Sequence, residues 1–430
     1  MSKVIVIGAG PMGLASAYQA LRDGHQVDVL EASDNAGGMA AHFDFGGLSL
    51  ERFYHFVCRA DHSTFELLRD LGIAEKLVWR PTSMGFYFAG KLNPWGDPIS
   101  LLTLPETSLM MKLRYGLFAF VCTRRRTWPS LEERSAKDWI IQWCGVAGYN
   151  QFWRSLLEFK FYEDAERISA AWIWTRIKRV GLSRKNIMQE EMGYIEGGSE
   201  TLVHALVDRI KEQGGQIHLS SPALRVNVAD GRVSGVDTAA AHYDADYVIS
   251  TMPIPLVPAI IPDLSETVKA QYRAIKNIGI CCVVLKLSRS VSPHFWINVE
   301  DENIDIPGVI EFTNLRDLGV TIVYVPYYMP VSHEKFSWSD AQFTRDAMDC
   351  LFRLNPSLLE SDLLESRVFR LRHAQPVCEV GFASKLPPVQ TAIDGLQVAD
   401  TCFYYPEDRS ISESVRLGRE MAKRIGKGHG

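Results

Sequence analysis

The chain opens with a run of β-branched residues, followed at once by a glycine-rich turn and a stretch with helical spacing. In residues 3–8, KVIVIG, the four positions 4–7 form a continuous β-branched apolar run, which is typical of a parallel strand buried on both faces. Residues 14–24, LASAYQALRDG, repeat apolar positions at the period of a helix, and Gly24 suits its C-cap. Residues 25–31, HQVDVLE, predict a second strand. The pattern therefore predicts strand, turn, helix and strand.

Two later regions follow different patterns. Residues from about 95 to 190 are rich in helix formers and aromatic residues, which predicts a helical layer. Residues from about 275 to 380 contain strand-like runs such as IGICCVVLKL and VTIVYVPYY, which predict an antiparallel sheet. A chain of 430 residues with 47% hydrophobic composition exceeds what one compact domain usually holds, so two domains are expected.

Composition narrows the classes of function. The net charge of -5 comes without a long block of like charge, so nucleic acid is not an expected partner. The eight cysteines include no CxxC pair; no zinc or other metal site is expected, and reduced thiols in the cytoplasm are the simplest interpretation.

Residues 108–126, SLMMKLRYGLFAFVCTRRR, are the most membrane-like stretch. Lys112 and Arg114 interrupt it, and the uncharged part is shorter than the ~20 residues of a spanning helix. A helix of the substrate domain is the favoured interpretation. The alternative is peripheral contact with the inner face of the membrane, because an apolar face followed by three arginines suits an interfacial helix.

Glycines at 8, 10 and 13 have the spacing of a dinucleotide-binding turn. Gly8 suits a tight turn, Gly10 lets the backbone approach a pyrophosphate, and Gly13 lets helix and strand pack closely. Pro11 and Met12 begin the helix, whose N-terminal N–H groups and dipole favour phosphate. These five residues are therefore predicted to bind a cofactor.

An acidic residue and a second glycine pair extend this motif. Glu31 ends the second strand about 20 residues beyond the glycines, where a carboxylate hydrogen-bonds ribose hydroxyls. Gly37 and Gly38 follow a few residues later, with Met39 next.

With this combination the sequence resembles the flavoprotein superfamily of amine oxidases, protoporphyrinogen oxidases, phytoene desaturases and UDP-galactopyranose mutases. In that superfamily a Glu followed by a Gly-Gly pair marks FAD, and the backbone of the pair lies near its phosphates and ribityl chain. Relatives commonly place Arg after the pair where this chain has Met39. The resemblance implies that the backbone contacts persist without the arginine side chain.

Two further segments carry the resemblance along nearly the whole chain. Residues 193–228 resemble the return to the FAD domain, which implies that the backbone near Val226 lies beside the adenine. Residues 395–425, GLQVADTCFYYPEDRSISESVRLGREMAKRI, resemble the last FAD motif. It implies that Asp400 contacts the ribityl or phosphate region and that a helix from about Ser412 points at the flavin, with Ser410 or Ser412 as its cap.

The resemblance implies an α/β Rossmann-like FAD-binding domain with an inserted α+β substrate domain. The FAD-binding domain is expected from residues 1–80, 193–255 and 385–430. Residues 81–192 and 256–384 are expected to form the substrate domain, and the ligand is expected between the two.

Three residues are candidates for catalysis. His55 lies in LSLERFYHFV, where UDP-galactopyranose mutases place a histidine near the ring; the alternative is a histidine satisfied by backbone. Lys286 lies in an apolar strand, and amine oxidases use a strand lysine to hold a water near the flavin; the alternative is a solvent-facing lysine. Tyr405, in FYYPEDR, is placed to wall the pocket, as is Tyr404.

The leading hypothesis is an FAD-dependent oxidoreductase that removes a hydride from a small-molecule substrate. One alternative is a flavin-dependent sugar isomerase similar to UDP-galactopyranose mutase, which would need arginines for substrate phosphates. Another is a flavin-bound subunit without turnover. The candidate arginines are Arg176, Arg179, Arg372 and Arg409.

The substrate class rests on a more limited resemblance. Through ERFYHF, VYVPYY and YPEDR the chain is similar to a branch associated with cell-surface glycan synthesis. This implies a sugar nucleotide or a lipid-linked sugar as substrate. The oligomeric state is left open.

Overall fold

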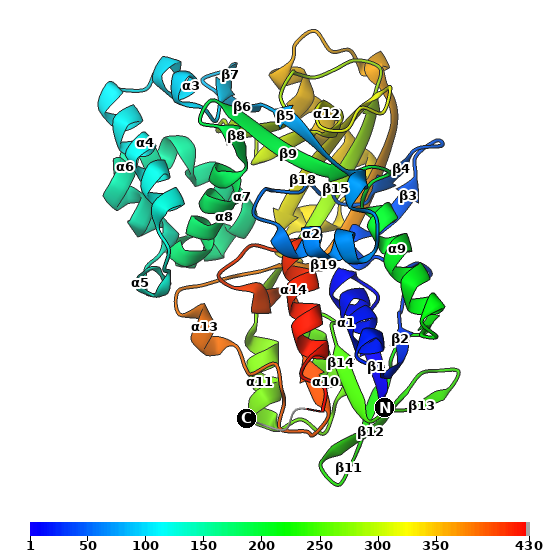
Figure 1. Ribbon diagram of the computed structural model, residues 1–430. Coiled ribbons are helices and arrows are strands. Elements are labelled where there is room, and N and C mark those ends of the chain that lie inside the picture. The colour runs from blue at the N-terminus through cyan, green and yellow to red at the C-terminus, as the bar shows by residue number, and fades with distance from the viewer. Residues whose placement is uncertain (427–430) are drawn as a thin grey trace.

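The computed structural model describes residues 1–426, and residues 427–430 lie outside the described part of the chain. A five-stranded parallel sheet occupies the lower part of the molecule in Figure 1. Its strand order is β10 (Gln216–His218), β2 (Gln26–Leu30), β1 (Lys3–Ile7), β14 (Tyr247–Ser250) and β20 (Leu396–Val398). All neighbours pair in parallel, and the strands come from three separate parts of the chain.

Helices α1 (Pro11–Arg22), α9 (Ser199–Glu212) and α14 (Ile411–Ala422) cover this sheet, and α2 (His62–Asp70) packs on α14. Helices α1 and α14 approach each other closely because α14 has a glycine, Gly418, at the contact. A Cβ atom at residue 418 would lie 2.3 Å from the Met12 carbonyl oxygen, and Ser16 Oγ donates to the Gly418 carbonyl at 3.0 Å. The first and last helices of the chain are thereby held together.

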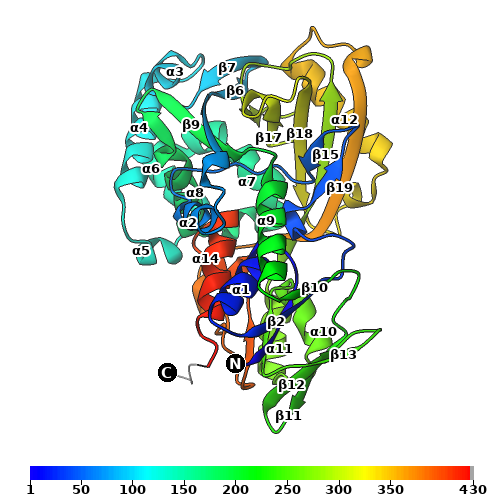
Figure 2. The same cartoon turned by 45° about the vertical axis from the view of Figure 1, so that its right-hand side comes forward.

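A seven-stranded, mainly antiparallel sheet forms the upper part (Figure 2). Its order is β19 (Leu363–Pro376), β15 (Asn277–Leu287), β18 (Thr321–Met329), β17 (Gly308–Glu311), β16 (Trp296–Glu300), β6 (Met84–Phe88) and β7 (Lys91–Trp95). The pairing of β6 with β16 is parallel and joins strands from both predicted insertions in one sheet.

Strand β15 is apolar throughout because both of its faces are covered. Ile280, Cys282 and Val284 face the core toward the rest of the molecule. Cys281 and Val283 face a second core that includes α12 (Asp340–Leu354). Each alternating position therefore meets packed side chains, which explains a continuous rather than an alternating pattern.

The helical layer lies on the left of Figure 1. It consists of α3 (Pro98–Thr103), α4 (Leu109–Arg124), α5 (Pro129–Glu132), α6 (Ala136–Phe152), α7 (Arg154–Phe161) and α8 (Ala170–Leu182). Serine side chains cap three of these helices, since Ser108, Ser135 and Ser169 each accept an N–H from the first turn of α4, α6 and α8. Helix α4 packs between α6 and α8.

Two strands link the upper and lower parts. Strands β5 (Leu77–Thr82) and β9 (Gln189–Ile195) pair antiparallel, and β8 (Arg184–Asn186) extends them. The boundaries expected at 80/81 and 192/193 fall inside these strands, because the chain leaves and re-enters as a paired ribbon rather than through loops.

The other elements are smaller. A three-stranded sheet contains β11 (Arg225–Ala229), β12 (Arg232–Asp237) and β13 (His242–Asp244), and β3 (His42–Asp44) pairs with β4 (Ser49–Glu51). Short helices are α10 (Val257–Ile260), α11 (Glu266–Ala274) and α13 (Phe382–Lys385), and Thr401–Tyr404 forms the 3₁₀ turn η8. All eight cysteines are buried and free. Across residues 1–426, every helix is too short or too polar to cross a membrane.

Candidate functional site

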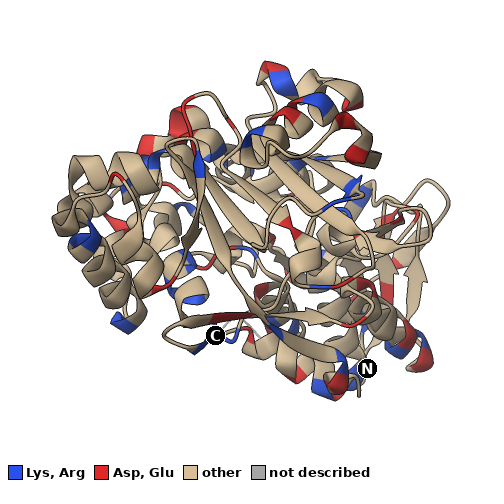
Figure 3. Cartoon of the chain, turned by 90° about the horizontal axis from the view of Figure 1, so that it is seen from above, with Lys and Arg blue, Asp and Glu red and all other residues tan. Residues whose placement is uncertain are grey.

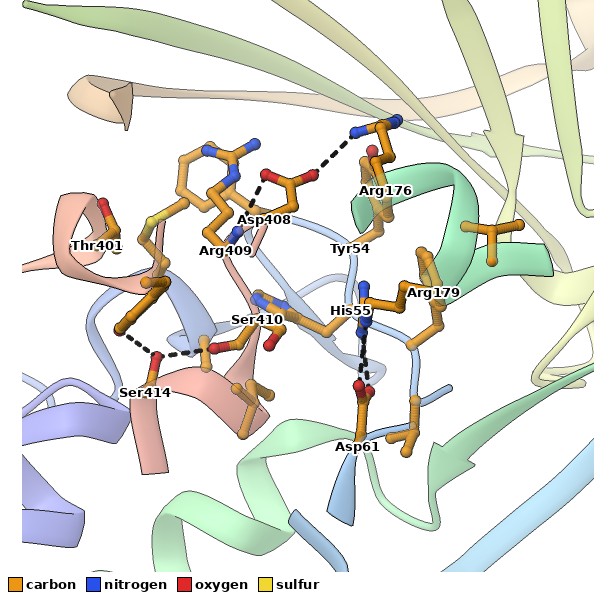
Figure 4. Close-up of a pocket in the computed structure, with 18 of the residues that line it drawn as sticks. Tyr54, His55, Asp61, Arg176, Arg179, Thr401, Asp408, Arg409, Ser410 and Ser414 are labelled. Carbon is orange, nitrogen blue, oxygen red and sulfur yellow. Dashed lines mark hydrogen bonds and ion pairs between the residues drawn. The ribbon is translucent and has the colours of Figure 1, made fainter. Parts of the chain in front are cut away.

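One cavity of about 1260 Å³ runs from the parallel sheet to the helical layer. At one end its wall is the glycine-rich turn after β1; at the other it reaches α3, α4 and α8. A volume above the usual 300–1,000 Å³ of a single small-molecule pocket suits two ligands in contact, or one long one. Figure 4 shows part of the middle of this cavity.

The glycine end is a cradle made of backbone. Gly8 has a φ of +104° and donates its N–H to the Leu30 carbonyl at 2.8 Å. A Cβ atom at residue 13 would lie 1.9 Å from the Gly8 carbonyl oxygen, and one at residue 38 would lie 3.0 Å from the Gly10 Cα atom. Strand β1, helix α1 and the Gly37–Gly38 pair therefore lie so close to one another that only glycine fits at these positions.

Helix α1 points an uncapped N-terminus into this cradle. Gly10 is its N-cap, no side chain bonds the first N–H groups, and the first turn holds no acidic residue. Pro11 and Met12 line the cavity together with Gly38 and Met39. Unsatisfied N–H groups at the positive end of a helix form a ready site for a phosphate anion.

Glu31 stands beside this anion site. Its Oε2 accepts the Ala9 N–H at 2.7 Å and its Oε1 accepts the Ser33 N–H at 2.8 Å. Each carboxylate oxygen keeps a lone pair for a further donor, as a ribose hydroxyl would supply. Gly37 lies just behind and donates to the Ala9 carbonyl at 2.8 Å.

The C-terminal segment closes the same end. Asp400 is buried and lines the cavity; it accepts N–H groups from Ile254 at 2.8 Å and Cys402 at 2.9 Å. Burial raises the pKa of Asp400, although these hydrogen bonds oppose the shift. Ser410, rather than Ser412, caps α14 by accepting the Glu413 N–H at 3.1 Å.

Charged side chains gather in the middle of the cavity. Asp408 lies between Arg176 and Arg409 (Figure 4), and its carboxylate pairs with Arg176 at 3.0 Å. Arg409 donates to the Tyr328 hydroxyl at 2.6 Å and to the Ala374 carbonyl. Burial raises the pKa of Asp408, but the nearby cations, including Lys160, outweigh it and hold that pKa at about 2.

Lys160 adds a third cation behind this group. Its side chain is 2% exposed, and its ammonium lies 4.7 Å from the ring centre of Tyr328 and 4.9 Å from that of Trp172. Burial lowers the pKa of Lys160 well below its usual value; Asp408 opposes the shift and the two arginines reinforce it. Two arginines and this buried lysine thus surround one carboxylate.

Arg179 is neutralised separately. Its guanidinium donates two parallel hydrogen bonds to Asp61, at 3.0 and 2.8 Å, and both residues line the cavity (Figure 4). This fork geometry fixes the guanidinium plane. Arg179 therefore contributes shape and donors more than net charge.

Glu51 and Arg316 form a second polar group on the wall. Glu51 Oε1 accepts from the N–H of Ser199 at 2.9 Å and from its hydroxyl at 3.0 Å. Its Oε2 and the Nη1 of Arg316 are buried, and neither has a partner among the described residues. Neither residue was predicted from the sequence as a site residue, although Glu51 begins the motif ERFYHF.

The far arm of the cavity is apolar. Trp95, Leu101, Tyr115, Phe120 and Trp153 line it, together with Leu156, Ile177 and Val180. These side chains belong to the helical layer and to β7. The cavity therefore connects a polar middle section to an apolar arm.

Comparison with known proteins decides the family. Residues 13–405 match the family model described as flavin containing amine oxidoreductase. The chain belongs to this family. It is a flavin-containing oxidoreductase, and the predicted resemblance and Rossmann-like α/β fold with a substrate domain are confirmed.

The flavoenzyme is similar to several characterised proteins. It is 22% identical to the 15-cis-phytoene desaturase of Arabidopsis thaliana over 404 residues, which are 86% of this chain and 69% of that protein. An oxidoreductase from Methanosarcina mazei has a TM-score of 0.76 at 18% identity, covering 98% of this chain and 100% of that one. Reduced UDP-galactopyranose mutase has a TM-score of 0.76 at 15% identity, covering 99% and 94%; both structures show a shared fold.

The cradle fits the flavin cofactor that the family implies. A nucleotide-bearing flavin brings a phosphate group, and the uncapped start of α1 offers N–H donors for one. Glu31 retains acceptor capacity, and the close approach of Gly38 to Gly10 leaves no side chain over the turn. Of the predicted cofactor residues, the cavity wall includes Gly8, Gly10, Pro11, Met12, Glu31, Gly38, Met39 and Asp400.

Three of the predicted cofactor residues lie directly behind the cavity wall, and a fourth, Val226, lies elsewhere. Gly13 and Gly37 permit the close packing, and Ser412 is buried at the second position of α14 while Ser410, Ile411 and Ser414 face the cavity. Val226 is fully buried in β11 and does not line the cavity.

The wall beside the expected adenine position is formed a few residues earlier than predicted. Pro222 and Ala223, in the loop before β11, line the cavity in place of Val226. Because β11 belongs to the separate three-stranded sheet, the chain has already turned away from the cofactor end by residue 226.

His55 is the predicted catalytic residue that reaches the cavity (Figure 4). Burial lowers its pKa to about 4, so the imidazole is neutral at pH 7; the charge of Glu51 opposes this shift. Its Nδ1 is buried and has no partner among the described residues. A neutral imidazole with a free nitrogen is able to exchange a proton with a bound ligand.

Lys286 lies outside the cavity. It is six positions further along β15 than Ile280, which does line the cavity; at the rise of a strand this is about 20 Å. There its ammonium lies 5.9 Å from the ring centre of Phe45, and Lys286 pairs across the ladder with Glu365. The register of β15 therefore carries Lys286 past the cavity, away from the position expected of a residue that holds a water at the flavin.

Tyr405 also points away. Its hydroxyl bonds Ser169 Oγ at 2.7 Å and donates to Glu132, and its ring packs against Trp128 and Phe382. The neighbouring Tyr404 lines the cavity instead. Arg372, the remaining predicted arginine, lies over the Phe336 ring and outside the cavity wall.

Proposed function

We propose that this flavoenzyme binds FAD and oxidises an amphiphilic small molecule that carries an anionic group. When bound, the flavin accepts the hydride that the substrate carbon loses. FAD is preferred to a mononucleotide because the cradle has features for both halves of a dinucleotide: an uncapped helix for pyrophosphate and Glu31 for the adenosine ribose.

The observation that carries the proposal is the excess of buried positive charge beside an apolar arm in one cavity. Lys160, Arg176 and Arg409 surround the single carboxylate of Asp408. Within the described residues Arg409 makes no ion pair with a carboxylate. Uncompensated buried charge is costly, so a phosphate or carboxylate of the substrate would be stabilised there and a cationic amine repelled.

The apolar arm supports a hydrocarbon portion in the same substrate. Its walls are aromatic and aliphatic side chains of α4, α7 and α8, and such a surface binds a chain or ring system by the hydrophobic effect. A lipid-linked sugar or an isoprenoid phosphate has both parts. The buried free cysteines support a reducing, cytoplasmic setting.

His55 supplies the proton chemistry in this proposal. Its imidazole is neutral at pH 7, so its Nδ1, which has no partner among the described residues, is available to take a proton from a substrate hydroxyl as the hydride leaves. Tyr54 and the Arg179–Asp61 pair shape the adjacent wall (Figure 4).

The first test is the absorbance spectrum of the purified protein, followed by anaerobic reduction with dithionite and readmission of air. The expected result is bound flavin that is released on denaturation as FAD. Protein that binds no flavin, or that releases FMN, would overturn the cofactor assignment. Reoxidation within seconds identifies oxygen as a competent acceptor.

The second test addresses the substrate. Farnesyl phosphate, farnesol and farnesylamine are titrated against the oxidised protein, with the flavin spectrum as readout. The phosphate should bind at least about tenfold more tightly than the amine, because truncating or reversing one member of a buried charge pair costs about 2–5 kcal/mol. Arg409→Gln should remove this preference, while Arg209→Gln, on the exposed face of α9, should keep it.

A second candidate is a sugar isomerase similar to UDP-galactopyranose mutase. It is favoured by the same observation, since Arg176 and Arg409 are donors suited to a diphosphate. UDP-galactopyranose incubated with the dithionite-reduced protein distinguishes the two: isomerisation without net oxidation supports the mutase, and substrate-dependent flavin reduction supports the oxidoreductase. Bound flavin with neither activity supports a non-catalytic subunit.

A further inference from the structure

Helix α4 presents an apolar stripe to solvent. Met110, Leu113, Leu117 and Phe120 are 66, 55, 55 and 56% exposed. Their spacing of three and four residues places them on one face of the helix. Figures 1 and 2 both show α4 at the outer edge of the helical layer.

Neighbouring elements extend the stripe into a patch. Exposed apolar side chains also come from α3, from the end of α8 and from the turn between β8 and β9. We define the α4 patch as Ile99, Leu102, Leu109, Met110, Leu113, Leu117, Phe120, Leu182, Ile187 and Met188. Because α3 and α8 both pack against α4, these exposed apolar side chains lie on neighbouring elements, and such a grouping marks a site of contact with a protein or a membrane.

The cavity opens within this patch. Phe120, Leu182 and Ile187 line the cavity and are also exposed to solvent, so they stand at its mouth. They come from three different elements, α4, α8 and the β8–β9 turn. A ligand that enters the cavity between these three side chains therefore passes through the patch.

Positive charge borders the patch. Residues 98–128 contain five Lys or Arg and one Glu, whereas the whole chain has a net charge of -5. Arg124 and Arg126, at the end of α4, are exposed. Seen from above, the helices on the left of Figure 3 show mostly tan ribbon with a few charged segments.

We propose that the α4 patch docks on the surface of an anionic lipid bilayer, so that the cavity mouth faces the lipid. The apolar side chains enter the boundary between headgroups and acyl chains, and Arg124 and Arg126 meet the lipid phosphates. Charge complementarity favours this occupant over a second copy of the chain, because two copies of a basic segment repel each other. This goes beyond the proposed function, since it assigns a surface and a route of entry rather than a reaction.

The test is flotation of the purified, flavin-loaded full chain with vesicles. Vesicles of phosphatidylcholine and phosphatidylglycerol in about a 2:1 ratio are compared with vesicles of phosphatidylcholine alone. The chain should float with the anionic vesicles, and high salt should weaken the binding. Turnover is not measured, so failure of the proposed reaction does not affect this result.

Variants locate the surface. The double variant Leu113→Gln/Leu117→Gln should reduce the bound fraction at least about tenfold, because the inserted apolar groups are lost. Leu359→Gln/Leu364→Gln is the matched control, since both leucines are exposed but lie outside the patch; it should bind like the unmodified chain. Arg124→Gln/Arg126→Gln should bind anionic and neutral vesicles equally.

Two outcomes would overturn the proposal. One is equal flotation of the Leu113/Leu117 variant and its control. The other is a dimer, seen by light scattering without vesicles, that the same variant dissociates, because the patch would then be an interface between copies. Flavin absorbance and thermal unfolding of each variant verify that it is folded.

Discussion

The glycine-lined end of the cavity and its cation-lined middle are built from different parts of the chain: the first from backbone and the second from side chains. At the first, backbone groups of Gly8, Gly10 and Gly38 form the surface of the turn. At the second, side chains from three distant segments converge, with Tyr54 and Asp61 from the first, Arg176 and Arg179 from α8, and Asp408 and Arg409 from the C-terminal part. Under the proposed function, a cofactor shared by many enzymes would meet main chain, whereas the substrate would meet replaceable side chains.

The largest effect is expected at the backbone end. Gly13→Ala should lower the free energy of unfolding by more than about 4 kcal/mol, because its Cβ would lie 1.9 Å from the Gly8 carbonyl oxygen. Gly10→Ala has only the Gly38 Cα within 4 Å, at 3.8 Å. It should stay folded and lose flavin affinity. Urea unfolding and flavin absorbance of both variants measure this contrast, and equal stability would refute it.

The next effect concerns the charged side chains. Asp61→Asn should cost about 3–5 kcal/mol because it leaves Arg179 buried without a counter-charge. Asp70→Asn is the control, since Asp70 forms exposed ion pairs with Arg22 and Arg419 worth at most about 1 kcal/mol. Urea unfolding at pH 7 compares them. Similar losses of unfolding free energy in the two variants would show that the Asp61–Arg179 pair stabilises the fold no more than an exposed ion pair does.

A smaller effect depends on pH. The pKa of His55 is about 4 in the folded chain against 6.5 in the unfolded chain, so below pH 6.5 the unfolded state binds the extra proton. Stability should therefore fall from pH 6.5 toward 4, with a contribution of up to about 1.4 kcal/mol per pH unit from this residue. In His55→Gln this contribution should disappear. Urea unfolding of both chains between pH 4.5 and about 7.5 measures this difference. If stability falls equally with pH in the unmodified chain and in His55→Gln, the prediction is contradicted.

The smallest effects are expected outside the cavity. Lys286→Met and Tyr405→Phe should change the rate of flavin reoxidation by less than about twofold, because neither residue reaches the wall. Tyr54→Phe, within the wall, serves for comparison. A large loss of rate in Lys286→Met would restore the role that its resemblance implied.

Sequence was informative where the structure is local. The glycines, Pro11, Glu31 and Gly38 lie within the first forty residues, and their spacing alone indicates the turn they form. Asp400 was similarly accessible because it ends a strand and caps the turn that follows.

Prediction from the sequence failed where a shift of one or two positions along the chain changes the direction in which a side chain points. Ser410 and Ser412 differ by about 200° around a helix, and only the cap geometry shows which one faces the cavity. Tyr404 ends a short 3₁₀ turn and packs in one core, whereas Tyr405 follows the turn and packs against the other. The pairing of Glu51 with Ser199 and the placement of Arg316 depend on tertiary packing, which no local pattern encodes.

The place of β20 and α14 at the end of the chain has a consequence for biosynthesis. The parallel sheet stays incomplete until residues 396–398 have been made, and Asp400 and the Ser410 cap come later still. A nascent chain still on the ribosome therefore exposes an open sheet edge and half of a cofactor site, and edges of this kind favour aggregation. The wall of the site is therefore complete only after α14 has been made and has packed against α1.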